Sequence, residues 1–125
     1  MRIAYDSAHR EVMLSSSVKG WDEFSEKLKT DHNKIILDTD FDPHPYDCKA
    51  SMLEVVTKED SSKILIRALE DNAIEISGCV SALNVFISNV QSCASADSPG
   101  HFHFDSISFE DVVDANAWDM VFVVL

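Results

Sequence analysis

The stretch at residues 74–90, IEISGCVSALNVFISNV, joins a strand pattern to a helix pattern. Its first residues alternate apolar and polar side chains, which is typical of a half-buried strand. The residues that follow place apolar side chains at helical spacing, at Leu83, Phe86, Ile87 and Val90. This spacing predicts a helix over residues 79–94, and its β-branched residues require packing to hold it. We expect Gly78 to let the chain turn between the strand and the helix.

A similar pattern occurs 62 positions earlier, in the segment VMLSSSVKGWDEFSEKL at residues 12–28. Five pairs of apolar residues coincide when the two segments are aligned: Leu14 with Ile76, Val18 with Val80, Trp21 with Leu83, Phe24 with Phe86, and Leu28 with Val90. The match lies in apolar positions more than in identities, and it suggests two ββαβ-like halves. We therefore predict a single α+β domain over residues 1–125, with two helices packed on one face of a mostly antiparallel sheet.

The remaining elements follow from alternation and from turn residues. RIAYDSAHREVMLSS at residues 2–16 reads as two short strands around a turn, and residues 18–30 form the first helix. Further strands are expected at residues 34–41, 51–57, 63–69, 72–78 and 101–107. The apolar run WDMVFVVL at residues 118–125 predicts a buried central strand.

Composition excludes several classes of protein. The chain has 125 residues with 46% hydrophobic residues, and 22 acidic residues exceed ten Lys and Arg to give a net charge of −12. Phosphate binding needs clustered basic residues, so we expect no nucleic-acid ligand. We expect no membrane association and a cytoplasmic location, because the sequence has no long apolar window and no signal-peptide pattern. The cysteines, Cys48, Cys79 and Cys93, form no C-x-x-C pair, which favours free thiols.

The charge is unevenly distributed along the chain. Arg67 is the last Lys or Arg, and residues 68–125 contain nine acidic residues, so this half carries −9 and the first half −3. We expect a sustained negative field over part of the surface. A basic protein partner would fit this field, as would a solvated acidic surface that has no partner.

The segment GHFHFD at residues 100–105 places His101, His103 and Asp105 on one face of a strand and two phenylalanines on the other. A His-x-His pair with a carboxylate can chelate a transition metal. Such a site needs a further ligand, and nothing in the sequence brings Asp42 or His44 close. We therefore expect the phenylalanines in the core, the polar face outward at a partner-binding surface, and no metal or cofactor.

Two further groups of acidic residues are candidates for partner binding. Asp38, Asp40 and Asp42 alternate in LDTDFD and would share one face of the predicted strand at residues 34–41. They could hold a hard cation, guard an exposed sheet edge or face a partner; the EF-hand glycine is absent. Glu110, Asp111 and Asp114 follow the His/Asp strand and would add charge to its face.

Recognisable catalytic motifs are missing. There is no G-x-S-x-G elbow, no phosphate-binding glycine loop and no H-E-x-x-H, and the chain has only three glycines. This lowers the expectation of an enzyme. Trp118 would be the best aromatic anchor of an interface if it is exposed, with a place in the core as the alternative.

The order of elements, the helix segment ISGCVSALNVFISNV and above all GHFHFD at residues 100–105 resemble small immunity proteins of bacterial polymorphic-toxin systems, in particular the immunity family numbered thirty-two. The resemblance implies a non-enzymatic protein that binds the toxic domain of a cognate toxin. A nuclease toxin would fit, because an acidic inhibitor can imitate the phosphate backbone in a basic substrate groove. The alternative is a small metal-binding enzyme or sensor that uses His101 and His103, and the sequence leaves a homodimer open.

Overall fold

The computed structural model describes residues 1–30 and 34–125, in which the chain forms two helices and nine strands. The helices are α1 (Val18–Thr30) and α2 (Val80–Ala94), close to the predicted bounds. The strands are β1 (Arg2–Asp6), β2 (Glu11–Ser16), β3 (Lys34–Ile36), β4 (Cys48–Lys49), β5 (Met52–Thr57), β6 (Leu65–Leu69), β7 (Ala73–Gly78), β8 (Gly100–Phe104) and β9 (Asp119–Val124). Strand β4 has only two residues and has no counterpart among the predicted strands.

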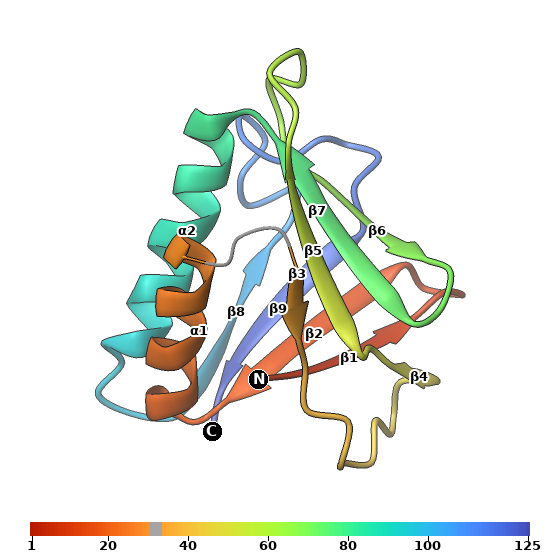
Figure 1. The fold of residues 1–125 in the computed structure, drawn as a ribbon, viewed down its shortest axis with the longest axis vertical. Helices are drawn as coiled ribbons and strands as arrows, with labels where there is room; N and C mark the ends of the chain where they lie inside the picture. The colour runs from red at the N-terminus through yellow and green to blue at the C-terminus, as the bar shows by residue number, and fades with distance from the viewer. Residues whose placement is uncertain (31–33) are drawn as a thin grey trace.

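The strands form two sheets, with the orders β4-β1-β2-β9-β8 and β3-β5-β7-β6. Strands β2 and β9 pair in parallel, as do β5 and β7, and the other pairs are antiparallel. The two helices pack against each other and lie together at one side of the sheets (Figure 1). The predicted α+β class with mostly antiparallel pairing is confirmed. The prediction of a single sheet is wrong, because the strands form two sheets.

Each half of the chain contributes strands to both sheets. Strands β1 and β2 of the first half share a sheet with β9 and β8 of the second, and the β2–β9 pair joins them. Strands β6 and β7 of the second half share the other sheet with β5 and β3 of the first, and the β5–β7 pair joins them. The orders β1-β2-β9-β8 and β6-β7-β5-β3 therefore correspond, and each second strand leads into a helix. This arrangement agrees with the two halves that the sequence repeat suggests, with their last strands exchanged.

The core lies between the helices and the inner faces of both sheets. Trp21, Phe24 and Leu28 of α1 are buried in it, as are Leu83, Phe86 and Val90 of α2. Phe122, on the central strand β9, is fully buried, with ring centroids 5.2 Å from Trp21, 5.9 Å from Phe86, 5.4 Å from Phe102 and 5.9 Å from Phe104. These separations are typical of favourable aromatic pairs. The predictions of a buried central last strand and of inward-facing phenylalanines are confirmed.

Gly78 serves close packing and not an unusual backbone angle, because no glycine among the described residues has a positive φ. A Cβ atom at this position would lie 3.3 Å from the carbonyl oxygen of Lys63 and 3.4 Å from the Cα atom of Ile64. The segment before β6 therefore approaches the end of β7 so closely that a side chain would press on backbone.

The predicted strand at residues 34–41 is shorter than expected, because β3 ends at Ile36. Beyond it, the carboxylate of Asp38 accepts a hydrogen bond from the N–H of Asp40, and that of Asp42 accepts one from the N–H of His44. Such bonds two residues ahead are Asx turns, which replace the strand with a loop. The interpretation that these aspartates share one strand face is therefore wrong.

Neither described helix has the length and apolar character that are needed to cross a membrane.

Candidate partner-binding face

The sheet that contains β1, β2, β9 and β8 has one face in the core and one outward face. On β2 and β9, Val12, Leu14, Met120, Phe122 and Val124 belong to the core. Side chains alternate between the two faces of a strand, so the residues between them point outward. We call this outward surface the outer face.

Four carboxylates lie in line across one end of the outer face. Asp6 pairs with Glu11 between β1 and β2, and Glu11 pairs with Asp119 between β2 and β9. Asp105 directly follows β8, one residue beyond the Phe104–Met120 pair, which places it level with Asp119. We call Asp6, Glu11, Asp119 and Asp105 the acidic row.

Three members of the acidic row are held by hydrogen bonds. The carboxylate of Asp6 accepts the N–H of Ala8 at 2.9 Å and lies 2.7 Å from Nδ1 of His9. The carboxylate of Asp105 accepts the N–H groups of Ile107 at 3.1 Å and Ser108 at 2.8 Å. The hydroxyl of Tyr46 donates to Glu11, so the loop after β3 is tied to this end of the sheet.

Ionisation of Asp119 is disfavoured in the folded protein. Partial burial raises the pKa of its carboxyl above the ordinary value, and the negative charges of Asp105 and Glu11 raise it further. In contrast, the hydrogen bond between Asp6 and His9 lowers the pKa of Asp6 and raises the pKa of His9, so each keeps the other charged. Burial and the contact with Glu11 raise the pKa of Tyr46, which keeps its hydroxyl protonated as a donor.

The second sheet shows that this fold does not require acids at these positions. Its corresponding strands, β6, β7, β5 and β3, carry Leu69, Ala73, Met52 and Ile36 in line where the first sheet carries the acidic row. The same backbone arrangement thus accepts apolar residues. Like charges placed opposite each other destabilise a strand pair. The acidic row is therefore a feature of the first sheet that the second sheet does not repeat.

His101 and His103 lie where the sequence predicts, on the outer face and exposed, with ring centroids 6.1 Å apart. Asp105 differs from the prediction. It is only 8% exposed, and its carboxylate is turned into the backbone of the following turn, 3.9 Å from Nδ1 of His103. A strand was predicted to continue to residue 107, but these Asx bonds end it at Phe104.

Glu110, Asp111 and Asp114 lie in the turns between β8 and β9, and Lys63 lies close to the first two. The ammonium group of Lys63 donates to the carbonyl oxygen of Glu110 at 2.8 Å, and Lys63 borders a shallow depression with Glu110 and Asp111. Asp114 caps a local turn by accepting the N–H of Asn116. The charge of this segment is thus partly offset by Lys63.

Asp38, Asp40 and Asp42 lie in the loop after β3, where all three are exposed. Asp38 pairs with Arg2 at 3.4 Å across exposed side chains, and the hydrogen bond from Asp40 and the charge of Arg2 lower its pKa. Their role in partner binding stays a prediction, with Asp40 and Asp42 as the exposed charges of the loop.

Trp118 is partly buried and packs on Tyr5, with ring centroids 6.4 Å apart. Its backbone N–H donates to the carbonyl oxygen of Ile66 at 2.9 Å, so it joins the two sheets. This favours a structural role over that of an interface anchor.

Within residues 1–30 and 34–125, no three His, Cys, Asp or Glu side chains are grouped so that they could hold a metal ion. His101, His103 and Asp105 are close in sequence but do not form such a group, with or without Asp42 and His44. No observation on the described residues therefore favours the metal-binding alternative.

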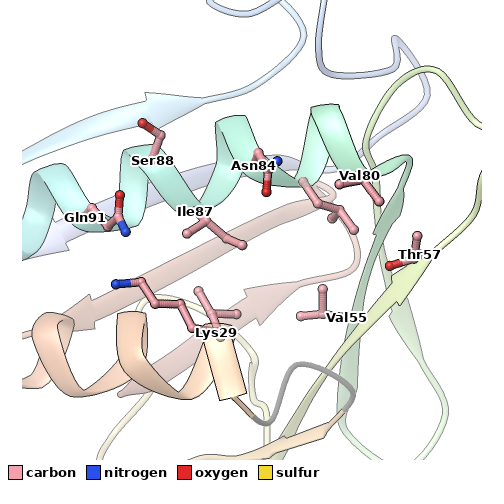
Figure 2. Close-up of a pocket in the computed structure, with 10 residues that line it drawn as sticks. Lys29, Val55, Thr57, Val80, Asn84, Ile87, Ser88 and Gln91 are labelled. Carbon is pink, nitrogen blue, oxygen red and sulfur yellow. The ribbon is translucent and has the colours of Figure 1, made fainter.

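A groove of about 600 Å³ lies between the end of α1, α2 and β5, away from the outer face (Figure 2). Leu28, Val55 and Leu83 contribute buried apolar side chains to it, while Val80 and Ile87 are more exposed. The polar lining residues are Lys29, Thr57, Asn84, Ser88 and Gln91. These lining residues include no carboxylate, histidine or cysteine, so they offer no acid–base pair or nucleophilic thiol.

Asp105 was identified from the sequence but the acidic row was not, because Asp6 and Glu11 lie about a hundred residues from Asp105 and Asp119 in the chain. The only local signal was a carboxylate at the end or beginning of each strand, at Asp6, Glu11 and Asp119. Comparison of the chain with models of protein families, with curated proteins and with solved structures gives no match.

Proposed function

We propose that this protein is an immunity protein that binds a cognate bacterial toxin and neutralises it by direct contact, without catalysis. The observation that carries the proposal is the acidic row on the outer face of the first sheet. The resemblance of GHFHFD at residues 100–105 to the immunity family numbered thirty-two supports the same function. In this proposal the protein acts in the cytoplasm, where the toxin would otherwise act.

The acidic row suits a basic partner. Glu11 is partly exposed and Asp119 is exposed, whereas Asp6 and Asp105 are each only 8% exposed. On a chain of net charge −12, this aligned group attracts Lys and Arg side chains and accelerates encounter with them. The hydrogen bonds to Asp6, Glu11 and Asp105 hold these side chains in place before the partner arrives, which lowers the entropy lost on binding. A toxin with a basic substrate groove, such as a nuclease, has the complementary chemistry.

Association kinetics with the toxin domain encoded beside this gene test the role of the row. The double variant Glu11→Gln/Asp119→Asn removes two charges from it. The matched control Glu59→Gln/Asp60→Asn removes two charges from the exposed turn between β5 and β6. We expect the row variant to associate about tenfold more slowly at low salt, because interface charges act mainly on the association rate.

The control should change this association rate much less. Added salt should reduce the difference between the association rates of the two variants, because salt screens the charges. Equal effects of the two variants would mean that net charge alone, and not the acidic row, attracts the partner. No binding of the unmodified protein would contradict the proposed function itself.

A further inference from the structure

The outer edge of β8 differs from the other sheet edges in having no evident protection. Edge strands usually carry Lys, Pro or a bulge, are very short, or are covered by another segment. Strand β8 is a run of five residues, Gly-His-Phe-His-Phe, with no charged residue or proline. On its inner side it pairs with β9 over its whole length.

The other three edges are short or covered. Strand β4 has two residues, and β3 has three and begins with Lys34. The edge of β6 is covered by the segment before β9: Ile64 donates to Val112, Asp114 donates to Ile64, and Trp118 donates to Ile66, at 2.7 to 2.9 Å. Among residues 1–30 and 34–125, the backbone of β8 has no recorded hydrogen bond beyond its pairing with β9.

An unpaired strand edge of this kind can accept an extended segment of another protein, which adds a strand to the sheet. We propose that the edge of β8 pairs with an extended, basic segment of the bound toxin. This inference rests on the proposed function and specifies which element of the partner makes the contact.

The charge and the side chains around β8 favour such an occupant. A strand beside β8 would place alternate side chains on the outer face, next to His101, His103 and Asp105 and thus at the end of the acidic row. A Lys or Arg at this end of the added strand would lie beside Asp105 and two strands away from Asp119, within the negative field of both. The side chains on its opposite face could cover Phe102, which is only partly buried against Phe122. A second copy of this chain is disfavoured, because each copy carries a net charge of −12.

Amide hydrogen exchange of the full-length protein, free and with the toxin domain, tests this inference once a titration has shown that the complex forms. Alternate N–H groups of β8 point away from β9 and should exchange rapidly in the free protein. In the complex we expect their exchange to slow by about tenfold or more, as new backbone hydrogen bonds form.

The double variant His101→Thr/His103→Thr keeps strand propensity and the free backbone edge. In its complex with the toxin domain, the amides of β8 should still exchange at least about tenfold more slowly than in the free variant, because backbone pairing does not need the imidazole rings. A complex in which the amides of β8 exchange as fast as in the free protein would overturn the inference while leaving the proposed function intact. Slow exchange in the free protein together with a dimer mass by light scattering would also overturn it, because a second copy would then occupy the edge. Absence of any complex would instead contradict the proposed function.

Discussion

Asp119 lies directly opposite Glu11 where β9 runs parallel to β2, so two carboxylates from opposite ends of the chain face outward side by side. Asp105 lies close enough to add a third negative charge to the surroundings of Asp119. Burial and these charges make ionised Asp119 less favourable in the folded protein than in the unfolded chain.

Removing the charge of Asp119 should therefore stabilise the protein at neutral pH. A carboxyl whose pKa is raised by folding lowers stability as pH rises through the interval between its unfolded and folded pKa values, and the loss is complete above it. We expect Asp119→Asn to raise the free energy of unfolding by about 0.5 kcal/mol at pH 7, the size of a like-charge cross-strand repulsion. Urea unfolding at several pH values measures it, and the gain should shrink towards about pH 4.

Asp97→Asn, in the exposed loop after α2, is the control and should change stability little. A loss of stability in Asp119→Asn at pH 7 would show that its carboxylate makes a favourable contact, contrary to this account. A gain, in contrast, would mean that the protein keeps an unfavourable charge, which is common where a residue serves function.

Phe122 should be among the most costly residues to truncate, because its ring meets four other aromatic rings and is fully buried. We expect Phe122→Ala to lower the free energy of unfolding by about 3–5 kcal/mol, the range for large core cavities. Ile107→Ala provides a control, since Ile107 is 88% exposed and should change stability by less than about 0.5 kcal/mol. Chemical denaturation measures the free energy of unfolding of both variants. A similarly small change in each would contradict the assignment of Phe122 to the core.

Gly78 and Gly100 offer a paired test of close packing. A Cβ at Gly78 would press on the backbone carbonyl of Lys63, whereas a Cβ at Gly100 would meet no atom within 4 Å. We expect Gly78→Ala to lower the free energy of unfolding by about 1–2 kcal/mol through overpacking, and Gly100→Ala to be neutral or slightly stabilising. Thermal unfolding compares the two, and equal behaviour would argue against the close approach at Gly78.

The thiols of Cys79 and Cys93 should differ in reactivity. Hydrogen bonding with the Ser81 hydroxyl and then with backbone N–H groups at the start of α2 lowers the pKa of Cys79, which is partly exposed. Burial raises the pKa of Cys93 to about 12. Timed alkylation of the folded protein followed by mass spectrometry should therefore label Cys79 well before Cys93. Labelling of Cys93 at a comparable rate would indicate that the helix layer opens readily.

The elements themselves could be predicted because their causes are local. Trp21, Phe24 and Leu28 repeat at helical spacing, and the structure ends α1 within a residue of the predicted bound. The pairing of the strands could not be predicted. Strands β2 and β9 are neighbours in the sheet although almost the whole chain separates them in sequence, and no local pattern indicates that contact. Repetition at 62 positions indicated two halves, but not that they exchange their last strands.

The candidate site divides in the same way. Phe102 and Phe104 were placed inward and the two histidines outward by simple alternation. The prediction that the carboxylate of Asp105 points outward to a partner was wrong. A carboxylate at the end of a strand can accept hydrogen bonds from the backbone of the next turn, and the alternation of side chains along a strand does not predict this. The alignment of Asp6, Glu11 and Asp119 depends on the order of the strands in the sheet, so it could not be predicted from the sequence.

The central claim is that this protein neutralises a toxin by binding it, and inhibition of the toxin at defined molar ratios tests it most directly. The activity of the purified toxin domain encoded beside this gene would be followed as the full-length protein is added. The account predicts that activity falls in proportion to added protein and is abolished near one equivalent, with weaker inhibition by Glu11→Gln/Asp119→Asn at low protein concentration. Full toxin activity in the presence of a large molar excess would contradict the account.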